Sequence, residues 1–443
     1  MGLLNLSALA IAIVWSAQNV AFGQENPASV GLDQAKEFAA KNNYEIVALK
    51  QKLEAAASRR KSLNSAFMPK IGVTGGMELQ SNSGENEVPI GYLYGNYNLF
   101  NGFRDNYNSN LADIERDKIA IELKKMEFIV GLEVEQYFHT YLFYKDLIAL
   151  KYEAVELNEE HQKLVAKTKA AGIASQTDVM EFELKDSLLK SELFSLKQKQ
   201  EEARINLKRL LGQEIGSKIE PVGNLQHQHL NGTIMEYLNS MKTQSPSVLL
   251  AAKNQSAAEI SAKKARSGWM PSIDLQARAG YLPLDERTES CSVSGSSSQF
   301  LCENEEPGMT ISLTATYEFF SGFSTTYSRS EKLAEYSAAE AELRSEILNS
   351  ITNVETSYRR IKTIEARVDL EEDNVANGRK YYESVKKEYK RGFKNSADLS
   401  GAADGLFDAM ERRKRFKFDF LIERIGLERG LGTPVSIEVI KEK

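Results

Sequence analysis

Two short segments of the sequence carry an aspartate where it could act on an ion or a partner. Gly172 is followed by Ser-Gln-Thr-Asp at residues 175–178, and Gly392 is followed by Asn-Ser-Ala-Asp at residues 395–398. A Ser or Asn three residues before an acid is typical of a helix start, where backbone N–H groups stabilise the carboxylate. Capping alone is one interpretation of Asp178 and Asp398. The other is an acidic site that attracts cations and resists anions.

The chain offers little material for a metal centre, since it contains four histidines and two cysteines. His227 and His229 could ligate a metal, but no third ligand accompanies them, so a polar segment is expected there. The sequence shows no Ser/His/Asp arrangement and no paired-carboxylate motif of the kind that an enzyme site requires. We therefore expect no enzyme, and neither a catalytic residue, a metal ion nor a cofactor.

The charge balance excludes one broad class of partner. Lys and Arg number 56 against 62 Asp and Glu, which gives a formal net charge of −6. A nucleic-acid-binding protein needs an excess of cations clustered against the phosphates, so no nucleic acid is expected as a partner. The chain has only 28 Gly and 9 Pro in 443 residues, and this shortage of helix breakers favours long helices.

The first residues read as a targeting signal. Residues 3–15 are almost entirely apolar, and Ala-Phe-Gly at residues 21–23 provides a cleavage site. We expect a signal peptide at residues 1–23, although a buried N-terminal strand is the alternative. No later stretch has 18 consecutive apolar residues, so helical membrane spans are not expected. The mature chain is then exported, and it is either soluble or embedded in a membrane as β structure.

The sequence repeats itself. Pro-Lys-Ile at residues 69–71 recurs as Pro-Ser-Ile 202 residues later, and Phe-Asn-Gly-Phe at residues 100–103 recurs as Phe-Ser-Gly-Phe 220 residues later. From there the offset of 220 persists, and it relates Gly172 to Gly392 and Asp178 to Asp398. The predicted parts are a first repeat at 24–212, a linker at 213–232, a second repeat at 233–432 and a C-terminal tail at 433–443.

A long helix is predicted in each repeat. About 70 residues between Gly102 and Gly172 contain no proline, and apolar residues recur there with a mean step of 3.6, which is typical of one straight apolar stripe on an α-helix. At 1.5 Å per residue such a helix is about 100 Å long. Shorter helical stretches are predicted from Leu32 to about Ala66, from Asp178 to Leu211, from Thr233 to Ser267 and from Asp398 to Leu431. The predicted stripe consists of Ile119, Leu123, Met126, Val130, Val134, Tyr137, Tyr141, Tyr144, Ile148, Tyr152 and Val155.

Two β-hairpins are predicted, at about residues 69–101 and 271–321. Apolar and polar residues alternate there over 9–11 positions, as in the run from Ile311 to Phe319, and this is the length that a tilted transmembrane strand needs. A soluble two-sided sheet alternates in the same way and stays open as an alternative. In lipid an open sheet edge is too costly, and four strands cannot close a barrel, so other copies must supply strands. Three copies are favoured over two because twelve strands leave room for a lumen.

These features together resemble the TolC family of outer-membrane efflux and type I secretion channels. The resemblance rests on the signal, the duplicated Pro-x-Ile strand starts, the Leu-Phe-x-Gly-Phe turns and Arg-Leu-Leu-Gly at residues 209–212. It implies an α+β membrane protein: a homotrimer whose twelve-stranded outer-membrane β-barrel, with four strands per chain, continues into a periplasmic α-barrel of twelve helices. It also implies that the helical turns at Gly172 and Gly392 form the periplasmic entrance.

By the same resemblance, a ring of aspartates and a latch of hydrogen bonds between helices close this entrance. Asp398 matches the ring position, while the second ring position, one helical turn later, is Gly401. The latch positions fall on Thr177, Asp178, Tyr389 and Lys394. The turn residues Gly172 and Ile173, with Gly392 and Phe393, are the implied contacts of the adaptor.

A disulfide between Cys291 and Cys302 is expected in the Ser-rich, acidic stretch of the second hairpin, because exported chains favour paired cysteines. Two free thiols are the alternative. The predicted function is an outer-membrane exit channel that passes small molecules or unfolded proteins from an inner-membrane transporter, through a periplasmic adaptor, to the exterior. The competing class is an exported periplasmic coiled-coil scaffold without a pore.

Overall fold

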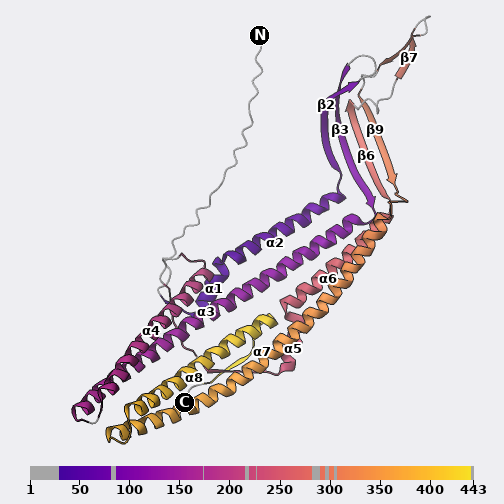
Figure 1. Ribbon diagram of the computed structural model, residues 1–443. Helices are drawn as coiled ribbons and strands as arrows, with labels where there is room; N and C mark the ends of the chain where they lie inside the picture. Colours follow the sequence, from indigo (N-terminus) through magenta and orange to yellow (C-terminus); the bar gives the residue numbers. More distant parts are fainter. Residues whose placement is uncertain are drawn as a thin grey trace, which may run out of the picture.

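The protein is a long rod with strands at one end and the turns of helical hairpins at the other (Figure 1). The computed structural model describes residues 29–80, 86–172, 174–214, 219–225, 227–281, 290–294, 299–303 and 307–440. The predicted signal peptide at 1–23 and the predicted adaptor contact Ile173 lie outside the described residues.

The same order of elements occurs twice along the chain. Each half has two short helices, two long strands, one helix of 67 residues and one helix of 35 or 36 residues. The first half contains α1 (Leu32–Asn42), α2 (Tyr44–Leu63), β2 (Lys70–Gln80), β3 (Asn86–Asn101), α3 (Arg104–Ala170) and α4 (Gln176–Leu210). The second contains α5 (Ile234–Gln244), α6 (Pro246–Lys264), β6 (Ser272–Tyr281), β9 (Gly308–Thr316), α7 (Ser324–Lys390) and α8 (Ser396–Leu431).

The stretch before the strands consists of two helices in each half, whereas the sequence predicted one continuous helical stretch. Asn43 ends α1 and begins α2, because its side chain accepts hydrogen bonds from the backbone N–H groups of Glu45 and Ile46 and donates to the carbonyl oxygen of Leu210. In the second half the break falls at Ser245, directly before Pro246, and proline cannot continue the helical hydrogen bonds of the preceding turn.

The apolar stripe of α3 changes course, in contrast to the single straight stripe that was predicted. Val130, Val134 and Tyr141 are buried as expected against the N-terminal helices, but Tyr152 is about half exposed. Beyond Tyr141 the buried positions rotate around the helix because its neighbours become α4 and α8. The buried residues of this lower part are Leu147, Leu150, Ala154, Asn158, His161 and Val165.

A four-stranded antiparallel sheet forms the strand end, in the order β2-β3-β6-β9. Its register places polar residues on one face, where the Asn98 amide donates to Asp274 at 2.7 Å, and apolar residues on the other. The strand β9 stops at Thr316, opposite Ser272, so Tyr317 and Phe319 lie beyond the strand that was predicted to include them. The apolar face exposes Ile71, Val73, Met77, Leu93, Met309, Ile311 and Leu313.

A separate two-stranded hairpin contains both cysteines. The strands β7 (Ser290–Ser294) and β8 (Gln299–Glu303) pair antiparallel, with Cys291 directly opposite Cys302. Residues opposite each other in such a pair have Cα atoms about 4.5–5.5 Å apart, which is within the range that a disulfide requires. The backbone therefore accommodates the predicted disulfide.

Four shorter strands complete the β structure of the described residues, and two 3₁₀ turns, Asn64–Phe67 and Ala265–Trp269, follow α2 and α6. The strands pair as β1 (Ser29–Val30) with β4 (Glu220–Pro221), and as β5 (His227–Leu230) with β10 (Ile437–Ile440). The second pair joins the segment between the repeats to the C-terminal segment.

A buried ion network ties the two halves together near the middle of the rod. Arg424 of α8 contacts Glu135 of α3, and its other nitrogen lies 3.0 Å from Glu428. Lys36 of α1 also pairs with Glu135. Although burial opposes ionisation, the charges of Arg424 and Lys36 hold the pKa of Glu135 below its usual value. The network fixes the position of α8 against α3.

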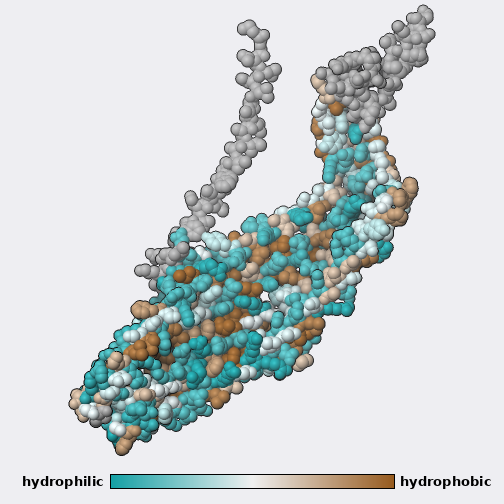
Figure 2. Space-filling model, viewed as in Figure 1, coloured by the Kyte–Doolittle hydropathy of each residue, from teal (hydrophilic) through white to brown (hydrophobic). Residues whose placement is uncertain are grey.

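Polar side chains dominate the visible surface near the helical turns, and apolar patches follow the helices farther up (Figure 2). Within the described residues, every helix is too short or too polar to cross a bilayer.

Candidate functional site

The two helical turns lie together at the end of the rod opposite the strands (Figure 1). Gly172 follows α3 with φ 74°, and Gly392 follows α7 with φ 79°. This left-handed conformation favours glycine because other residues place a Cβ against the backbone. At the second turn the N–H of Gly392 donates to the carbonyl of Tyr389 at 2.9 Å, and Phe393 donates to Glu388 at 3.0 Å. Both turns are therefore tight reversals between two long helices.

Both aspartates cap the helix that follows their turn. The Asp178 carboxylate accepts from the backbone N–H of Ser175 at 2.6 Å, and the Asp398 carboxylate accepts from that of Asn395 at 3.2 Å. The Ser175 N–H and then its hydroxyl group lower the pKa of Asp178, which stays ionised at neutral pH. Each helix also begins with a reciprocal capping box.

Asp398 also has a cation beside it. The Lys394 ammonium lies 3.8 Å from the Asp398 carboxylate, and both side chains keep more than a third of their surface exposed. The exposed pair is flexible and screened by water. Gly401, one turn farther along α8, faces open space and adds no second carboxylate.

Tyr389 forms a polar contact between the two hairpins, although its ring is buried. Its hydroxyl lies 3.4 Å from the hydroxyl of Thr168 on α3 and 3.4 Å from that of Ser396. Ser396 is 2% exposed, and its hydroxyl also lowers the pKa of Asp178 on the other hairpin. Thr177 is exposed and takes no part in these contacts within the described chain.

The structure thus brings together Lys394 with Asp398, and Tyr389 with residues that sequence reasoning missed. Thr168 and Ser396 had no distinguishing pattern, because a hydroxyl one turn from a helix end is common. The 220-residue offset gave no help, since it relates Ser396 to Gln176 and Thr168 to Glu388.

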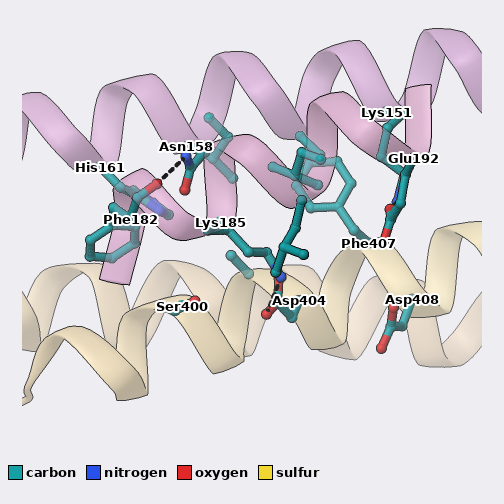
Figure 3. Close-up of a pocket in the computed structure, with 15 residues that line it drawn as sticks. Lys151, Asn158, His161, Phe182, Lys185, Glu192, Ser400, Asp404, Phe407 and Asp408 are labelled. Atoms are coloured by element: carbon teal, nitrogen blue, oxygen red, sulfur yellow. Dashed lines mark hydrogen bonds and ion pairs between the residues drawn. The ribbon is translucent and has the colours of Figure 1, made fainter. Parts of the chain in front are cut away.

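A polar groove lies directly above the turns, between α3 and α4 on one side and α8 on the other (Figure 3). Lys185 of α4 reaches across it to Asp404 of α8 at 2.7 Å. Closer to the helical turns, Nε2 of His161 lies 2.9 Å from the Tyr382 hydroxyl of α7. Burial, and then the charge of Lys386, lowers the pKa of His161 to about 4, so the ring is neutral at physiological pH.

The outermost turn surface is partly apolar. The Phe393 side chain is 77% exposed at the second turn, and Gly172 and Gly392 leave open space where a side chain would stand.

The profile of one protein family, described as outer membrane efflux protein, matches the chain twice, over residues 37–213 and 237–433. The chain belongs to the outer membrane efflux protein family. The double match confirms the internal duplication. Proteins of this family are transport channels and not enzymes.

Solved structures share the fold of this outer membrane efflux protein at low sequence identity. The outer membrane protein VceC from Vibrio cholerae is 14% identical with a TM-score of 0.76, and the match covers 91% of this chain and 96% of VceC. The CmeC outer membrane channel of Campylobacter jejuni is 14% identical with a TM-score of 0.75, and the match covers 90% of this chain and 85% of CmeC. The open state of the MtrE outer membrane channel of Neisseria gonorrhoeae is 15% identical with a TM-score of 0.74, and the match covers 91% of this chain and 89% of MtrE. No curated protein sequence matches this efflux protein significantly.

The family confirms the predicted outer-membrane location. This efflux protein lies in the outer membrane, and its helices extend into the periplasm. The helical turns are then the part of the molecule farthest from the membrane.

Proposed function

We propose that this efflux protein is the exit channel of a tripartite export system. In this system an inner-membrane transporter passes small molecules or unfolded proteins to the channel, and a periplasmic adaptor joins the two. Three copies together form one twelve-stranded barrel that continues into twelve helices around a single pore.

The sheet carries this proposal. Within the described chain, β2 and β9 each have a strand partner on one side only, and the exposed apolar face includes Ile71 and Val73, which are both more than three-quarters exposed. Hydrocarbon tolerates the apolar face but not the bare strand edges. Pairing β9 of one copy with β2 of the next removes both edges, and the polar face then lines the lumen.

The helices support the same assembly. In the part of the rod near the turns, α4 packs against α3, α3 against α8, and α8 against α7. This order leaves α4 and α7 at opposite edges of each copy. On α4, Met180 and Leu184 are exposed one turn apart on one helix face, whereas Leu188 lines the groove toward α8. A neighbouring copy would cover Met180 and Leu184.

We assign the gate to the helical turns. Three Asp398 carboxylates around the axis would form an acidic constriction, and Lys394 and Tyr389 would hold the closed arrangement together with Asp178 and Thr177. Lys394 is a flexible point charge, so it holds less rigidly than a bidentate arginine would.

We assign adaptor contact to the two turns, where Gly172, Ile173, Gly392 and Phe393 stand. We place the hairpin with Cys291 and Cys302 on the extracellular side and expect it to be closed by a disulfide. The predicted repeat boundaries at 24–212 and 233–432 belong to the same proposal.

Extraction from the cell envelope tests the proposed function against the pore-free scaffold. The channel should resist high salt and require detergent, and the extracted protein should form discrete conducting pores in planar lipid bilayers. Release by salt alone, or a detergent extract without pores, would favour the scaffold.

A further inference from the structure

Two tyrosine contacts of the same kind join the hairpins at different heights. The hydroxyls of Tyr382 and Tyr389 on α7 contact His161 and Thr168 on α3, respectively. Each pair lies seven residues from the other on both helices, which is two helical turns or about 10 Å. The lower contact belongs to the gate described above, whereas the upper contact has no assigned role.

The upper contact is the more deeply buried of the two. His161 is 2% exposed and Tyr382 is 4% exposed, and the Phe182 ring packs against the imidazole in a T-shaped arrangement with centroids 5.6 Å apart. Because both polar groups are buried, separating the helices here leaves each without its partner, which is costly. The charged groups around His161 are Lys386, Glu160 and Asp404.

A partly exposed ion pair joins α4 to α8 at nearly the same level. Figure 3 shows the Lys185 side chain of α4 extended toward Asp404 of α8, and their charged atoms are 2.7 Å apart. On α3, the amides of Asn158 and Gln162 both donate to the Phe182 carbonyl of α4 at 3.0 Å. The α3–α4 hairpin is therefore fixed internally at this height, and it can move against α7 and α8 only as a unit.

We propose that His161–Tyr382 and Lys185–Asp404 form a stop that limits how far the hairpins separate when the gate opens. The contacts at the turns release first, and the hairpins then diverge only below the stop. His161, Tyr382, Lys185 and Asp404 act as positioning residues for the gate, so this inference rests on the proposed function.

Distances between spin labels test the stop directly. Both native cysteines are first replaced by serine, and labels are placed at Ala171 and Ala397 near the turns, or at Ser195 and Arg415 above the stop. All four positions are partly or fully exposed. Three kinds of trimer are measured in lipid. The first is otherwise unaltered, and the second has its gate released by Tyr389→Phe and Lys394→Ser. The third carries these two substitutions together with Tyr382→Phe and Asp404→Asn in the stop.

Release of the gate should lengthen the lower distance and leave the upper distance unchanged. Adding the two stop substitutions should lengthen the upper distance as well. The control is Tyr381→Phe, which removes the hydroxyl of a neighbouring tyrosine that is 60% exposed in one copy.

A purely structural role would lower the melting temperature without moving the upper labels. In a channel with the released gate and an intact Tyr382, the charge swap Lys185→Asp with Asp404→Lys re-forms the ion pair, so the upper distance should be as short as in the unaltered channel. An upper distance that grows on gate release alone overturns the stop, and so does one that never responds to the stop substitutions. If the lower distance stays fixed on release, the proposed gate itself is wrong, and the stop falls with it.

Discussion

Thr168 and Tyr389 stand 221 residues apart in the sequence, yet their hydroxyl groups lie 3.4 Å from each other at the end of the rod. One belongs to the first repeat and the other to the second, so this contact joins two hairpins that have no covalent link at that end. A channel that opens by separating its hairpins must break it.

Replacing Tyr389 with Phe and Lys394 with Ser should raise the single-channel conductance in planar bilayers. A neutral hydrogen bond contributes about 1 kcal/mol, so three copies of the tyrosine change alone weaken the closed state by about 3 kcal/mol. Tyr381→Phe with Lys387→Ser is the matched control, because both residues are exposed on the same helix. Unchanged conductance in the first variant would remove Tyr389 and Lys394 from the gate.

Asp398→Asn should reduce the preference of the closed channel for cations. Two unit charges 4 Å apart in water interact by about 1 kcal/mol, which corresponds to roughly a fivefold change in the permeability ratio. Asparagine can still accept the capping hydrogen bond, so the helix start is preserved. The reversal potential in a salt gradient measures this ratio, and Glu183→Gln on the exposed surface of α4 serves as the control. An equal shift in both variants would argue against an acidic ring.

Arg424→Met should destabilise the protein strongly. The substitution leaves the buried Glu135 and Glu428 carboxylates without their shared cation, and breaking a buried pair in this way costs about 3–5 kcal/mol. Arg415→Met removes an exposed pair with Glu411 and should cost less than about 1 kcal/mol. Thermal unfolding followed by circular dichroism compares the two. Similar melting temperatures would show that the network contributes little.

The stability of the protein should fall as the pH drops from about 6.5 to about 4. Burial lowers the pKa values of His139 and His161 from 6.5 to about 4, so the unfolded chain binds more protons than the folded chain in this window. Above pH 6.5 each neutral, buried histidine contributes up to about 3 kcal/mol to the free energy of unfolding. This contribution is lost as the pH falls from about 6.5 to about 4. Unfolding midpoints of the parent and of His161→Gln at pH 7.5 and pH 5 check this sign. A steeper pH dependence in His161→Gln would contradict it.

Cys291 and Cys302 should resist alkylation until the protein is reduced. Their backbones are directly opposed in β7 and β8, and the predicted extracellular position is oxidising. Mass spectrometry after treatment with iodoacetamide, with and without prior reduction under denaturing conditions, counts the free thiols. Two alkylated cysteines without reduction would favour the free-thiol alternative.

Local patterns predicted the long helices and the strands, because a stripe or an alternation is written in neighbouring residues. The two 67-residue helices and the alternating runs around Ile71 and Ile311 are of this kind. The break at Asn43 depends partly on a contact with Leu210, and the rotation of the buried stripe beyond Tyr141 depends on which helix lies alongside. Neither is visible in a single stretch of sequence.

The site was predictable to the same extent. The capping pattern located Asp178 and Asp398 at helix starts, because caps act over three residues. Thr168, Ser396 and the His161–Tyr382 contact involve the other repeat or a buried partner, so only the folded arrangement reveals them.

The mass of the native particle tests the central claim most directly. Mature protein extracted in mild detergent and measured by native mass spectrometry should have three times the mass of one chain, with its strand content retained. A stable single copy in buffer without detergent, with the sheet intact, would contradict the shared barrel and the pore that depends on it.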